Sequence, residues 1–399
     1  MFKTRVPDNF KDKNICIVGL GYVGLTLAIS MAEVGFNVWG VEKIKDTVDK
    51  LKKGLPHFYE PKLKEKLKEL SIKGVLNLES SFPNNDRNWV YIITVGTPID
   101  ENKKIRLDIV EEASHQVGQH MKTGSLVILR STLKLGTTRN IVKPILNKYQ
   151  KDVDISFCPE RTIEGQALTE LRILPQIIGG LTLKSGLRSS TLFQFLTPTV
   201  VKVNEPETAE MIKMIDNTHR DISFAFSNEI ALACDSAGIS AVEVIQAGKL
   251  GYPRTDLYMP GPVGGPCLSK DPHILSEGLK TFDVNIELAS ISRKVNEALP
   301  KNILGTINRI LLESAPDKNI HKIGLLGLAF KGKPPTDDLR GSMAIPIIEE
   351  LKKEFKNVNF VGYDPMINKK NIEGLGINYA EEIKEAFVNS DLLLILNNH

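Results

Sequence analysis

Short apolar runs alternate with longer amphipathic stretches over the first half of the chain. The runs lie at 15–18, 89–95, 125–130, 153–157 and 176–179. Segments with helical spacing separate them, and this alternation indicates strands joined by crossover helices in a largely parallel sheet. We therefore expect ligands to bind at the carboxyl ends of these strands.

The second half of the chain begins with long helical patterns and then returns to short apolar runs. The helical patterns cover about 205–238 and 284–313. Apolar runs at 321–327 and 359–364 then resemble the first two strands of the chain, which predicts a second, smaller α/β domain. The final run, 391–399, is predicted to be a strand, and because no helix follows it, we expect the chain to be truncated there.

A glycine-rich turn follows the first apolar run. Residues 19–24 read Gly-Leu-Gly-Tyr-Val-Gly, a helical pattern follows, and Glu42 ends the next predicted strand. In such a turn Gly19 makes the tight bend, Gly21 lets the pyrophosphate approach the backbone, and Gly24 packs the helix on the strand. The acid at position 42 would hold the ribose hydroxyls, which favours NAD over NADP as the cofactor, whereas the basic Lys43 beside it would also tolerate a 2′-phosphate.

These patterns predict an α/β fold made of two Rossmann-like doubly wound domains joined by a central helical domain. A chain of 399 residues is too long for one ordinary core, so several domains are expected. The predicted domains are an NAD-binding domain at 1–200, a central helical domain at 201–315, and a Rossmann-like domain at 316–399. Two long central helices in such a chain would form the interface of a homodimer or higher homo-oligomer.

Composition narrows the class of protein further. The net charge of +3 over the whole chain does not indicate nucleic-acid binding. Glycines and Glu33 interrupt the apolar stretch 15–36, so this stretch is not predicted to span a membrane. The four cysteines lie far apart, without metal-ligand spacing, at Cys16, Cys158, Cys234 and Cys267. This spacing favours free thiols in a reducing compartment, and we expect a cytoplasmic protein without a metal site.

Residues 264–271, Gly-Gly-Pro-Cys-Leu-Ser-Lys-Asp, are the strongest chemical signal in the chain. A thiol is a nucleophile only as thiolate, and neighbouring cationic groups or backbone N–H groups favour that form. Lys270 and Asp271 follow the cysteine closely, and the two glycines allow a substrate to approach its sulfur. Cys267 is therefore a candidate nucleophile, although a buried structural cysteine in a turn would also fit this segment.

Polar residues follow several predicted strands, and another set shares one helix face. The strand ends carry Thr97, Ser131, Thr132, Glu160 and Arg161. Lys213, Asn217 and Arg220 are spaced to line one face of the helix predicted over 205–238. A solvent-exposed polar stripe would give the same helical spacing.

Taken together, these motifs resemble the UDP-glucose/GDP-mannose dehydrogenase family over essentially the whole chain. The segments that carry the resemblance are GLGYVG at 19–24, Tyr59-Glu60-Pro61, Gly96-Thr97-Pro98, Ser131-Thr132, Pro159-Glu160 with Glu164-Gly165, Glu210-x-x-Lys213-x-x-x-Asn217, Gly264-Gly265-x-Cys267-x-x-x-Asp271, and Gly327-Leu328-Ala329-Phe330-Lys331 with Asp338-x-Arg340-x-Ser342. Each is common alone, but their conjunction in this order is specific.

The resemblance implies oxidation of C6 of a nucleotide-bound sugar to the carboxylate with two NAD⁺ and no release of the aldehyde. Cys267 would trap the aldehyde as a thiohemiacetal, which is oxidised to a thioester. Water activated by Glu160 or placed by Asp271 would hydrolyse the thioester. Lys213 and Asn217 would stabilise the oxyanions, and a desolvated lysine or a carboxylate-activated water could take the hydroxyl proton in the first step.

The resemblance also implies which residues contact the two ligands. NAD contacts are expected from Gly19, Gly21, Tyr22, Val23, Gly24, Glu42, Thr97, Thr132 and Arg340. UDP-sugar contacts are expected from Arg161, Thr162, Lys213, Asn217, Arg220, Tyr252, Arg254, Gly264 and Lys331. The arginines resemble the branch that acts on UDP-N-acetylhexosamines, with UDP-N-acetylmannosamine as the expected substrate and a role in polysaccharide synthesis. The Lys270–Asp271 pair resembles the UDP-glucose branch, so UDP-glucose is the alternative.

Two other classes of protein share part of this pattern. One-step dehydrogenases of the 3-hydroxyacid or 6-phosphogluconate type have a Rossmann domain followed by a Lys-x-x-x-Asn helix, but they lack the cysteine loop and the third domain. A redox-sensing NAD-binding protein would use a reactive cysteine but would not need Lys213, Asn217 and Glu160 together. The yield of NADH per sugar distinguishes the three: two, one and none.

Overall fold

The computed structural model describes residues 5–84, 87–315 and 319–397. The chain forms two compact units. The first unit comprises 1–215 and 277–284, and the second unit comprises 216–276 and 285–399.

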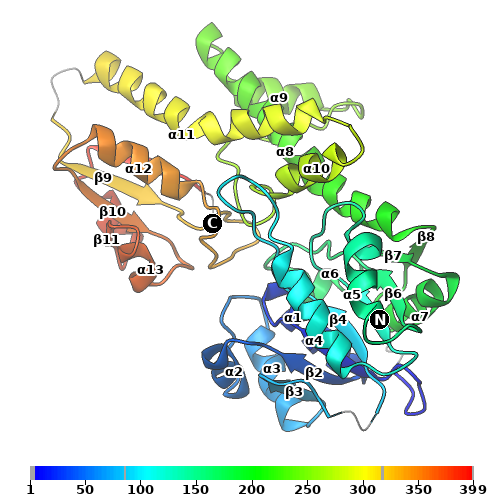
Figure 1. Ribbon diagram of the computed structural model, residues 1–399. Coiled ribbons are helices and arrows are strands. Elements are labelled where there is room, and N and C mark those ends of the chain that lie inside the picture. Colours follow the sequence, from blue (N-terminus) through cyan, green and yellow to red (C-terminus); the bar gives the residue numbers. More distant parts are fainter. Residues whose placement is uncertain (1–4, 85–86, 316–318, 398–399) are drawn as a thin grey trace. The chain divides into compact units, whose positions relative to one another are not determined.

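An eight-stranded sheet forms the centre of the first unit, with the order β3-β2-β1-β4-β5-β6-β7-β8 (Figure 1). Its strands are β1 (Asn14–Val18), β2 (Asn37–Val41), β3 (Leu76–Glu79), β4 (Val90–Ile93), β5 (Leu126–Leu129), β6 (Asp154–Phe157), β7 (Gln176–Gly180) and β8 (Val200–Val203). All pairings are parallel except that of β6 with β7, which is antiparallel. The predicted α/β sheet is therefore confirmed, with one antiparallel pairing that the apolar pattern did not reveal.

Helices cover both faces of this sheet. They are α1 (Tyr22–Val34), α2 (Lys45–Lys52), α3 (Leu63–Ile72), α4 (Asp108–His120), the π-helical turn η1 (Thr138–Val142), α5 (Lys143–Asn147), α6 (Ala167–Glu170) and α7 (Leu183–Gln194). Alternate residues of β1 enter different cores: Ile15 and Ile17 join the core that includes residues of α1 and α3, while Cys16 and Val18 join the core with α4. Because every strand between two helix layers is buried on both faces, these strands are continuous apolar runs in the sequence.

The second unit contains the long helices and a smaller sheet. Its helices are most of α8 (Pro206–Ala237), α9 (Ala241–Lys249), the start of α10 (Asp271–Lys280), α11 (Glu287–Ser314), α12 (Ala344–Glu354), α13 (Lys369–Glu373) and α14 (Ile383–Phe387). The strands are β9 (Lys322–Leu326), β10 (Asn359–Tyr363), β11 (Asn378–Tyr379) and β12 (Leu392–Ile395), in the all-parallel order β11-β10-β9-β12. The two predicted long helices and the second α/β sheet are confirmed. The strand predicted over 391–399 forms β12, and its residues 398–399 lie outside the described residues.

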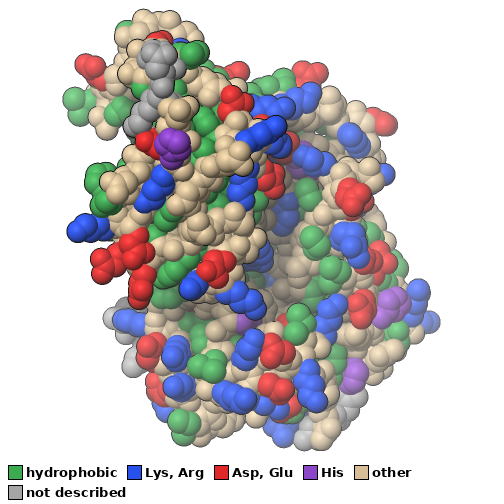
Figure 2. Space-filling view, turned by 90° about the vertical axis from the view of Figure 1, so that its left-hand side faces the viewer, with side chains coloured by type: hydrophobic (Ala, Val, Ile, Leu, Met, Phe, Trp, Pro, Cys, Tyr) green, Lys and Arg blue, Asp and Glu red, His purple; other side chains and the backbone are tan. Residues whose placement is uncertain are grey.

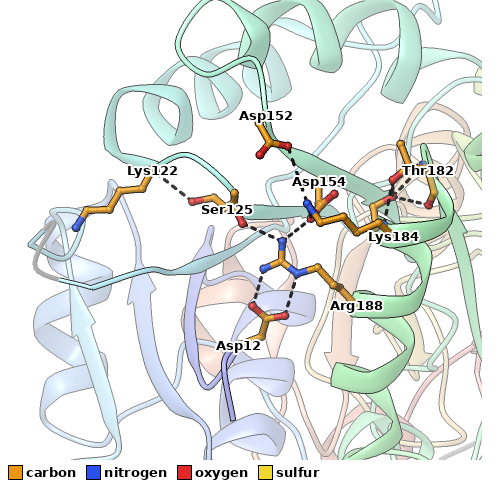
Figure 3. A network of polar contacts seen from close by, with 10 residues as sticks. Asp12, Lys122, Ser125, Asp152, Asp154, Thr182, Lys184 and Arg188 are labelled. Atoms are coloured by element: carbon orange, nitrogen blue, oxygen red, sulfur yellow. Dashed lines mark hydrogen bonds and ion pairs between the residues drawn. The ribbon is translucent and has the colours of Figure 1, made fainter. Parts of the chain in front are cut away.

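A buried ion-pair network joins the N-terminal segment to the amino end of the sheet in the first unit (Figure 3). Arg188 on α7 donates two hydrogen bonds to Asp12, at 2.6 and 3.1 Å, and one of 2.6 Å to Asp154 at the start of β6. The same guanidinium donates to the carbonyl of Gly124 at 2.9 Å. Removing one partner of such a pair typically costs about 3–5 kcal/mol, because it leaves a buried charge uncompensated. The network is therefore structural. It lies at the amino ends of the strands, whereas ligands are expected at their carboxyl ends.

The surface carries charges of both signs. Figure 2 shows Lys and Arg side chains interspersed with Asp and Glu side chains over the face it presents. This distribution agrees with the small net charge of +3. Within the described residues, no helix combines the length and the apolarity that crossing a bilayer requires.

Candidate functional site

The glycine turn after β1 has the geometry of a pyrophosphate cradle. Gly19 adopts a φ of +91° and donates its N–H to the carbonyl of Val41 at 2.8 Å. A Cβ on Gly24 would lie 1.9 Å from the carbonyl oxygen of Gly19, so only glycine lets α1 start this close to β1. A Cβ on Gly21 would meet nothing within 4 Å, which leaves the turn open beside the N-terminus of α1. These residues fit a dinucleotide phosphate.

Glu42, directly after β2, is held beside this turn. One carboxylate oxygen accepts the N–H of Leu20 at 3.0 Å, and the other accepts the N–H of Ile44 at 3.1 Å. A carboxylate has about four lone-pair positions, so both oxygens can still accept ribose hydroxyls. The carboxylate therefore sits where the sequence motif requires an acid, and it fits the adenosine ribose of NAD.

Tyr22, a predicted cofactor contact, uses its hydroxyl within the protein. The hydroxyl donates to the buried carboxylate of Glu60 and accepts the N–H of Gly165 at 3.0 Å. Burial, and then the neighbouring Glu60, raise the pKa of Tyr22 well above its usual value. The hydroxyl of Tyr22 therefore connects the first turn of α1 to the segment after Glu160. Val23, the other predicted cofactor contact in this turn, is half-buried.

Three further predicted residues lie just beyond the carboxyl ends of strands in the first unit. Thr97 follows β4 and is buried, Thr132 follows β5 and is half-buried, and Glu160 follows β6 and is buried. The next residue after Glu160, Arg161, is exposed. The carboxyl ends of parallel strands lie on the same side of the sheet. This placement therefore agrees with a ligand site at the carboxyl ends.

Glu210 lies less than one helical turn before Lys213 on α8 and binds this helix to the start of η1. Its carboxylate accepts the N–H of Gly136 at 2.6 Å, and the N–H and hydroxyl of Thr138 at 2.9 and 2.6 Å. Burial raises the pKa of Glu210 to about 7, although the three donors oppose the rise. Sequence reasoning found Glu210 only as part of a motif; its contacts show that it anchors the helix that carries Lys213.

Cys267 is the exposed cysteine of the chain. All four cysteines lie in the described residues, none forms a disulfide, and the other three are buried. The loop around Cys267 packs closely in the second unit: a Cβ on Gly264 would lie 2.0 Å from the carbonyl oxygen of Gly341, and Gly265 donates its N–H to that oxygen at 2.8 Å. The glycine pair is thus required by the approach of the segment around Gly341, and the exposed thiol excludes the interpretation as a buried structural cysteine.

A buried carboxylate orients two polar side chains beside the cysteine loop. Asp271, fully buried at the start of α10, accepts a 2.6 Å hydrogen bond from the amide nitrogen of Asn217. Its other oxygen forms an ion pair with Lys270 at 2.7 Å. Because the amide nitrogen of Asn217 carries two hydrogens, this contact fixes the amide and leaves a second N–H to donate to a ligand.

The remaining predicted residues are distributed over both units. Lys213 is half-buried in the first unit, and Arg220 is half-buried in the second. Arg254 stacks on the ring of Tyr252, with 4.5 Å from its guanidinium carbon to the ring centroid, and donates to the tyrosine hydroxyl at 3.1 Å. Lys331 lies 5.5 Å from the ring centroid of Phe330, and Arg340 is exposed and forms an ion pair with Asp338. The structure therefore brings Asn217 and Asp271 into contact within the second unit, while Glu160 and Lys213 belong to the first.

The turn after β9 repeats the geometry of the turn after β1. Gly327 has a φ of +77° and donates its N–H to the carbonyl of Tyr363 at 3.0 Å, as Gly19 does to Val41. One oxygen of Asp364 accepts the N–H groups of Leu328 and Ala329 at 2.7 and 2.9 Å. An acid at the end of the second strand thus closes the glycine turn in both sheets, which extends the strand repeat predicted from the sequence to the turn itself.

The fold and the site together define the class of protein. It is a nucleotide-dependent dehydrogenase with an exposed cysteine in a glycine loop and a second domain that resembles a nucleotide-binding domain. Sequence signatures of three domains match in order: the NAD binding domain at residues 13–197, the central domain at 207–298 and the UDP binding domain at 324–399. The chain belongs to the UDP-glucose/GDP-mannose dehydrogenase family, and it is an NAD-dependent nucleotide-sugar dehydrogenase.

Similar proteins come from archaea and bacteria. The UDP-N-acetyl-D-mannosamine dehydrogenase of Pyrococcus horikoshii is 33% identical over 88% of this chain and 84% of its own length. The enzyme of the same name from Escherichia coli is 31% identical over 96% of this chain and 93% of its own. A solved structure of the Pyrococcus horikoshii enzyme superimposes with a TM-score of 0.85 at 30% identity, covering 97% of this chain and 89% of that one.

A UDP-glucose dehydrogenase from Pyrobaculum islandicum has the same fold. Its structure superimposes with a TM-score of 0.86 at 24% identity, over 98% of this chain and 91% of that one. Because the two TM-scores are nearly equal, the backbone fold does not discriminate between the two sugars.

Proposed function

We propose that this protein oxidises C6 of a UDP-N-acetylhexosamine, UDP-N-acetylmannosamine, to the uronic acid through a thioester on Cys267. NAD⁺, held by the glycine turn 19–24 and Glu42, would supply the hydride acceptor for each of the two oxidations. The observation that carries the proposal is the exposed thiol of Cys267 in a glycine loop, within a chain whose family oxidises nucleotide sugars. A uronic acid of this kind would serve polysaccharide synthesis.

Cys267 forms and breaks the covalent bond in this scheme. Its sulfur adds to the C6 aldehyde, which gives a thiohemiacetal, and loss of a hydride and a proton converts that adduct to a thioester. Water then adds to the thioester carbonyl, the carbon–sulfur bond breaks, and the carboxylate and the thiol are released. One alcohol, one water and two NAD⁺ thus yield one carboxylate, two NADH and three protons.

Lys213 and Asn217 stabilise the oxygen at C6 while it carries negative charge. Each tetrahedral stage places charge on this oxygen, and donors aimed at that charge accelerate the reaction. Asp271 supports this role because it holds the amide of Asn217 with one N–H free to donate. A desolvated lysine or a carboxylate-activated water takes the proton of the C6 hydroxyl in the first oxidation.

The choice of an N-acetylated sugar rests on arginines and on similarity. Arg161, Arg220 and Arg254, with Thr162, Tyr252, Gly264 and Lys331, are the proposed UDP-sugar contacts, and Arg340 is a proposed cofactor contact. An arginine fork suits a diphosphate because it donates two parallel hydrogen bonds. The UDP-N-acetyl-D-mannosamine dehydrogenases at 31–33% identity favour the N-acetylated sugar. UDP-glucose is the second candidate, because the Lys270–Asp271 pair in the sequence resembles the UDP-glucose branch.

The direct test is the number of NADH molecules formed per sugar consumed. UDP-N-acetylmannosamine, UDP-N-acetylglucosamine, UDP-N-acetylgalactosamine and UDP-glucose are assayed in parallel at equal concentrations. We expect two NADH with UDP-N-acetylmannosamine and slow turnover with the others. One NADH with a released aldehyde would indicate a one-step dehydrogenase, and fastest turnover of UDP-glucose would overturn the proposed sugar.

We further propose a cytoplasmic homodimer formed through the central helices. Large apolar side chains are exposed on three helices of the second unit: Phe226 on α8 (50%), Val242 on α9 (47%), and Leu288 and Ile291 on α11 (64% and 50%). Exposed apolar surface of this kind marks association sites in proteins that are otherwise charged at the surface. We expect sedimentation velocity to give at least the mass of a dimer, and a 44.3 kDa monomer at micromolar concentration would contradict this.

A further inference from the structure

A buried chain of polar side chains connects helices α8 and α11 in the second unit. Asp221 on α8 is fully buried and forms an ion pair with Arg293 on α11 at 2.6 Å. The same carboxylate accepts the hydroxyl of Ser292 at 3.0 Å and the amide nitrogen of Asn296 at 2.9 Å. A buried carboxylate is stable only where donors and an opposite charge surround it, and these three side chains of α11 supply both.

The carboxylate of Asp221 fixes the orientation of two amide side chains. A carboxylate only accepts hydrogen bonds, so Asn296 turns its nitrogen toward Asp221, where it also donates to the backbone carbonyl at 3.0 Å. The oxygen of Asn296 then accepts the amide nitrogen of Asn228 on α8 at 3.1 Å. Asn228 is 2% exposed and Asn296 is fully buried, so neither amide can be reversed without leaving buried polar atoms unpaired.

Asn228 holds the backbone of Gly261 by two hydrogen bonds. Its amide nitrogen donates to the carbonyl of Gly261 at 3.2 Å, and its amide oxygen accepts the N–H of the same residue at 2.8 Å. A residue of a neighbouring antiparallel strand would form the same pair of bonds. The pairing requires the orientation that Asn296 imposes on Asn228, because a reversed amide would set donor against donor and acceptor against acceptor.

The segment 261–271, which carries Cys267, is held at both of its ends by one helix. Asn228 of α8 holds the first residue of this segment, and Asn217 of the same helix binds its last residue, Asp271, at 2.6 Å. Eleven residues separate the two asparagines, which is about three helical turns, so their amides lie on one face of α8. A single helix thus sets the distance between the two ends of the segment, with the thiol between them.

We propose that Asn228 is a positioning residue, which places the thiol of Cys267 for attack on the C6 aldehyde. The buried ion pair between Asp221 and Arg293 sets the direction of its amide. The proposal rests on the proposed function for its kinetic consequence, whereas its structural consequence is independent of the reaction. Because the first hydride transfer does not use the thiol, loss of Asn228 should slow only the steps that follow it.

Hydrogen–deuterium exchange tests the contact itself. The peptide 258–268 is compared between wild type, Asn228→Ala and a matched control, Ser227→Ala. An alanine at position 228 releases the N–H of Gly261, so we expect this peptide to exchange faster. Ser227 is buried beside Asn228 on α8, and its hydroxyl donates to the carbonyl of Ser223 in the same helix at 3.0 Å. Its variant removes a buried polar group from the helix and should leave exchange in the peptide unchanged.

Single-turnover kinetics separate positioning from a general loss of structure. With the UDP-sugar that wild type oxidises, we expect Asn228→Ala to form the first NADH at the wild-type rate. The second NADH should form at least about tenfold more slowly, because a misplacement of about 1 Å can cost up to about 10²-fold. The aldehyde that is not trapped should leave the enzyme and be detectable as a hydrazone. Ser227→Ala should form both NADH at wild-type rates.

The other outcomes overturn either this proposal or the proposed function. Unchanged exchange in Asn228→Ala would show that Asn228 does not hold Gly261. Equal slowing of both NADH steps would show that Asn228 supports the fold without placing the thiol, and faster exchange with wild-type kinetics would show that the thiol does not depend on this contact.

Two further results keep the proposal distinct from the proposed function and from a folding defect. If wild type forms no NADH with any UDP-sugar, the proposed function fails, while the exchange experiment still decides whether Asn228 holds Gly261. If Asn228→Ala does not fold, Asn228→Ser carries the same comparison, because a serine hydroxyl can still donate to Asn296 but cannot form both bonds to Gly261.

Discussion

Replacing Cys267 by serine is expected to abolish the four-electron oxidation, with a fall in turnover of at least about 10³-fold, since removing a covalent nucleophile costs that much or more. Serine keeps the size of the side chain but lacks an ionisable sulfur, so the aldehyde is not trapped. The first hydride transfer does not need the thiol, so a single turnover should still give up to one NADH per site. Stopped-flow absorbance at the NADH band measures both quantities.

The matched control is Cys234→Ser, a change of the same chemistry at a buried cysteine of the same unit. Cys234 is 6% exposed on α8 and has no role in the proposed reaction, so its variant should keep wild-type turnover even if its melting temperature falls. Alkylation with iodoacetamide should modify Cys267 before the buried cysteines and should stop turnover in parallel. Wild-type yield and rate in Cys267→Ser would show that the aldehyde is oxidised without a thioester.

The sequence pattern predicted the interior of the fold better than its edges. The central strands of the large sheet are buried on both faces and therefore form uninterrupted apolar runs, which the hydrophobic pattern detects. The edge strands β3 and β8 were not predicted, because β3 has only two buried apolar residues, Leu76 and Leu78, and none of the four residues of β8 over Val200–Val203 is buried. The antiparallel pairing of β7 was also missed, because strand direction depends on the connection and not on the composition of the strand.

In the site, the sequence predicted which residues form the motifs but not the contacts that their side chains make. The glycine turn, Glu42 and the cysteine loop were predicted because each requires particular residues at fixed spacing. Arg130, the buried ion-pair partner of Glu160, was missed, although it directly precedes Ser131 and Thr132, because an arginine at the end of a strand is indistinguishable in sequence from an exposed one. The hydrogen bonds of Glu160 with Arg130, Arg161 and Thr162 could not be predicted from the sequence either, because they depend on how the ends of β5 and β6 come together.

Asn217→Ala is expected to lower kcat by about 10²–10³-fold, the usual cost of removing one oxyanion donor. The KM for the UDP-sugar should change little, because the charge on the C6 oxygen develops only as the reaction proceeds. The substitution also removes a donor from the buried carboxylate of Asp271, which costs about 1–3 kcal/mol of stability. Thermal unfolding and steady-state kinetics of the same preparation separate these two effects.

The neighbouring Thr218 supplies the control for that experiment. It is 2% exposed on the same helix, and within the described residues its hydroxyl has no hydrogen-bond partner, so Thr218→Val changes the polarity of a buried side chain while preserving its shape. We expect wild-type kcat for Thr218→Val. If Asn217→Ala raised the KM and left kcat intact, the amide would bind the sugar in its ground state only, and Lys213 would remain as the sole proposed donor to the oxyanion. Because Asp271 directs one N–H of the amide away from the substrate and leaves the other available, we expect the loss to fall on kcat.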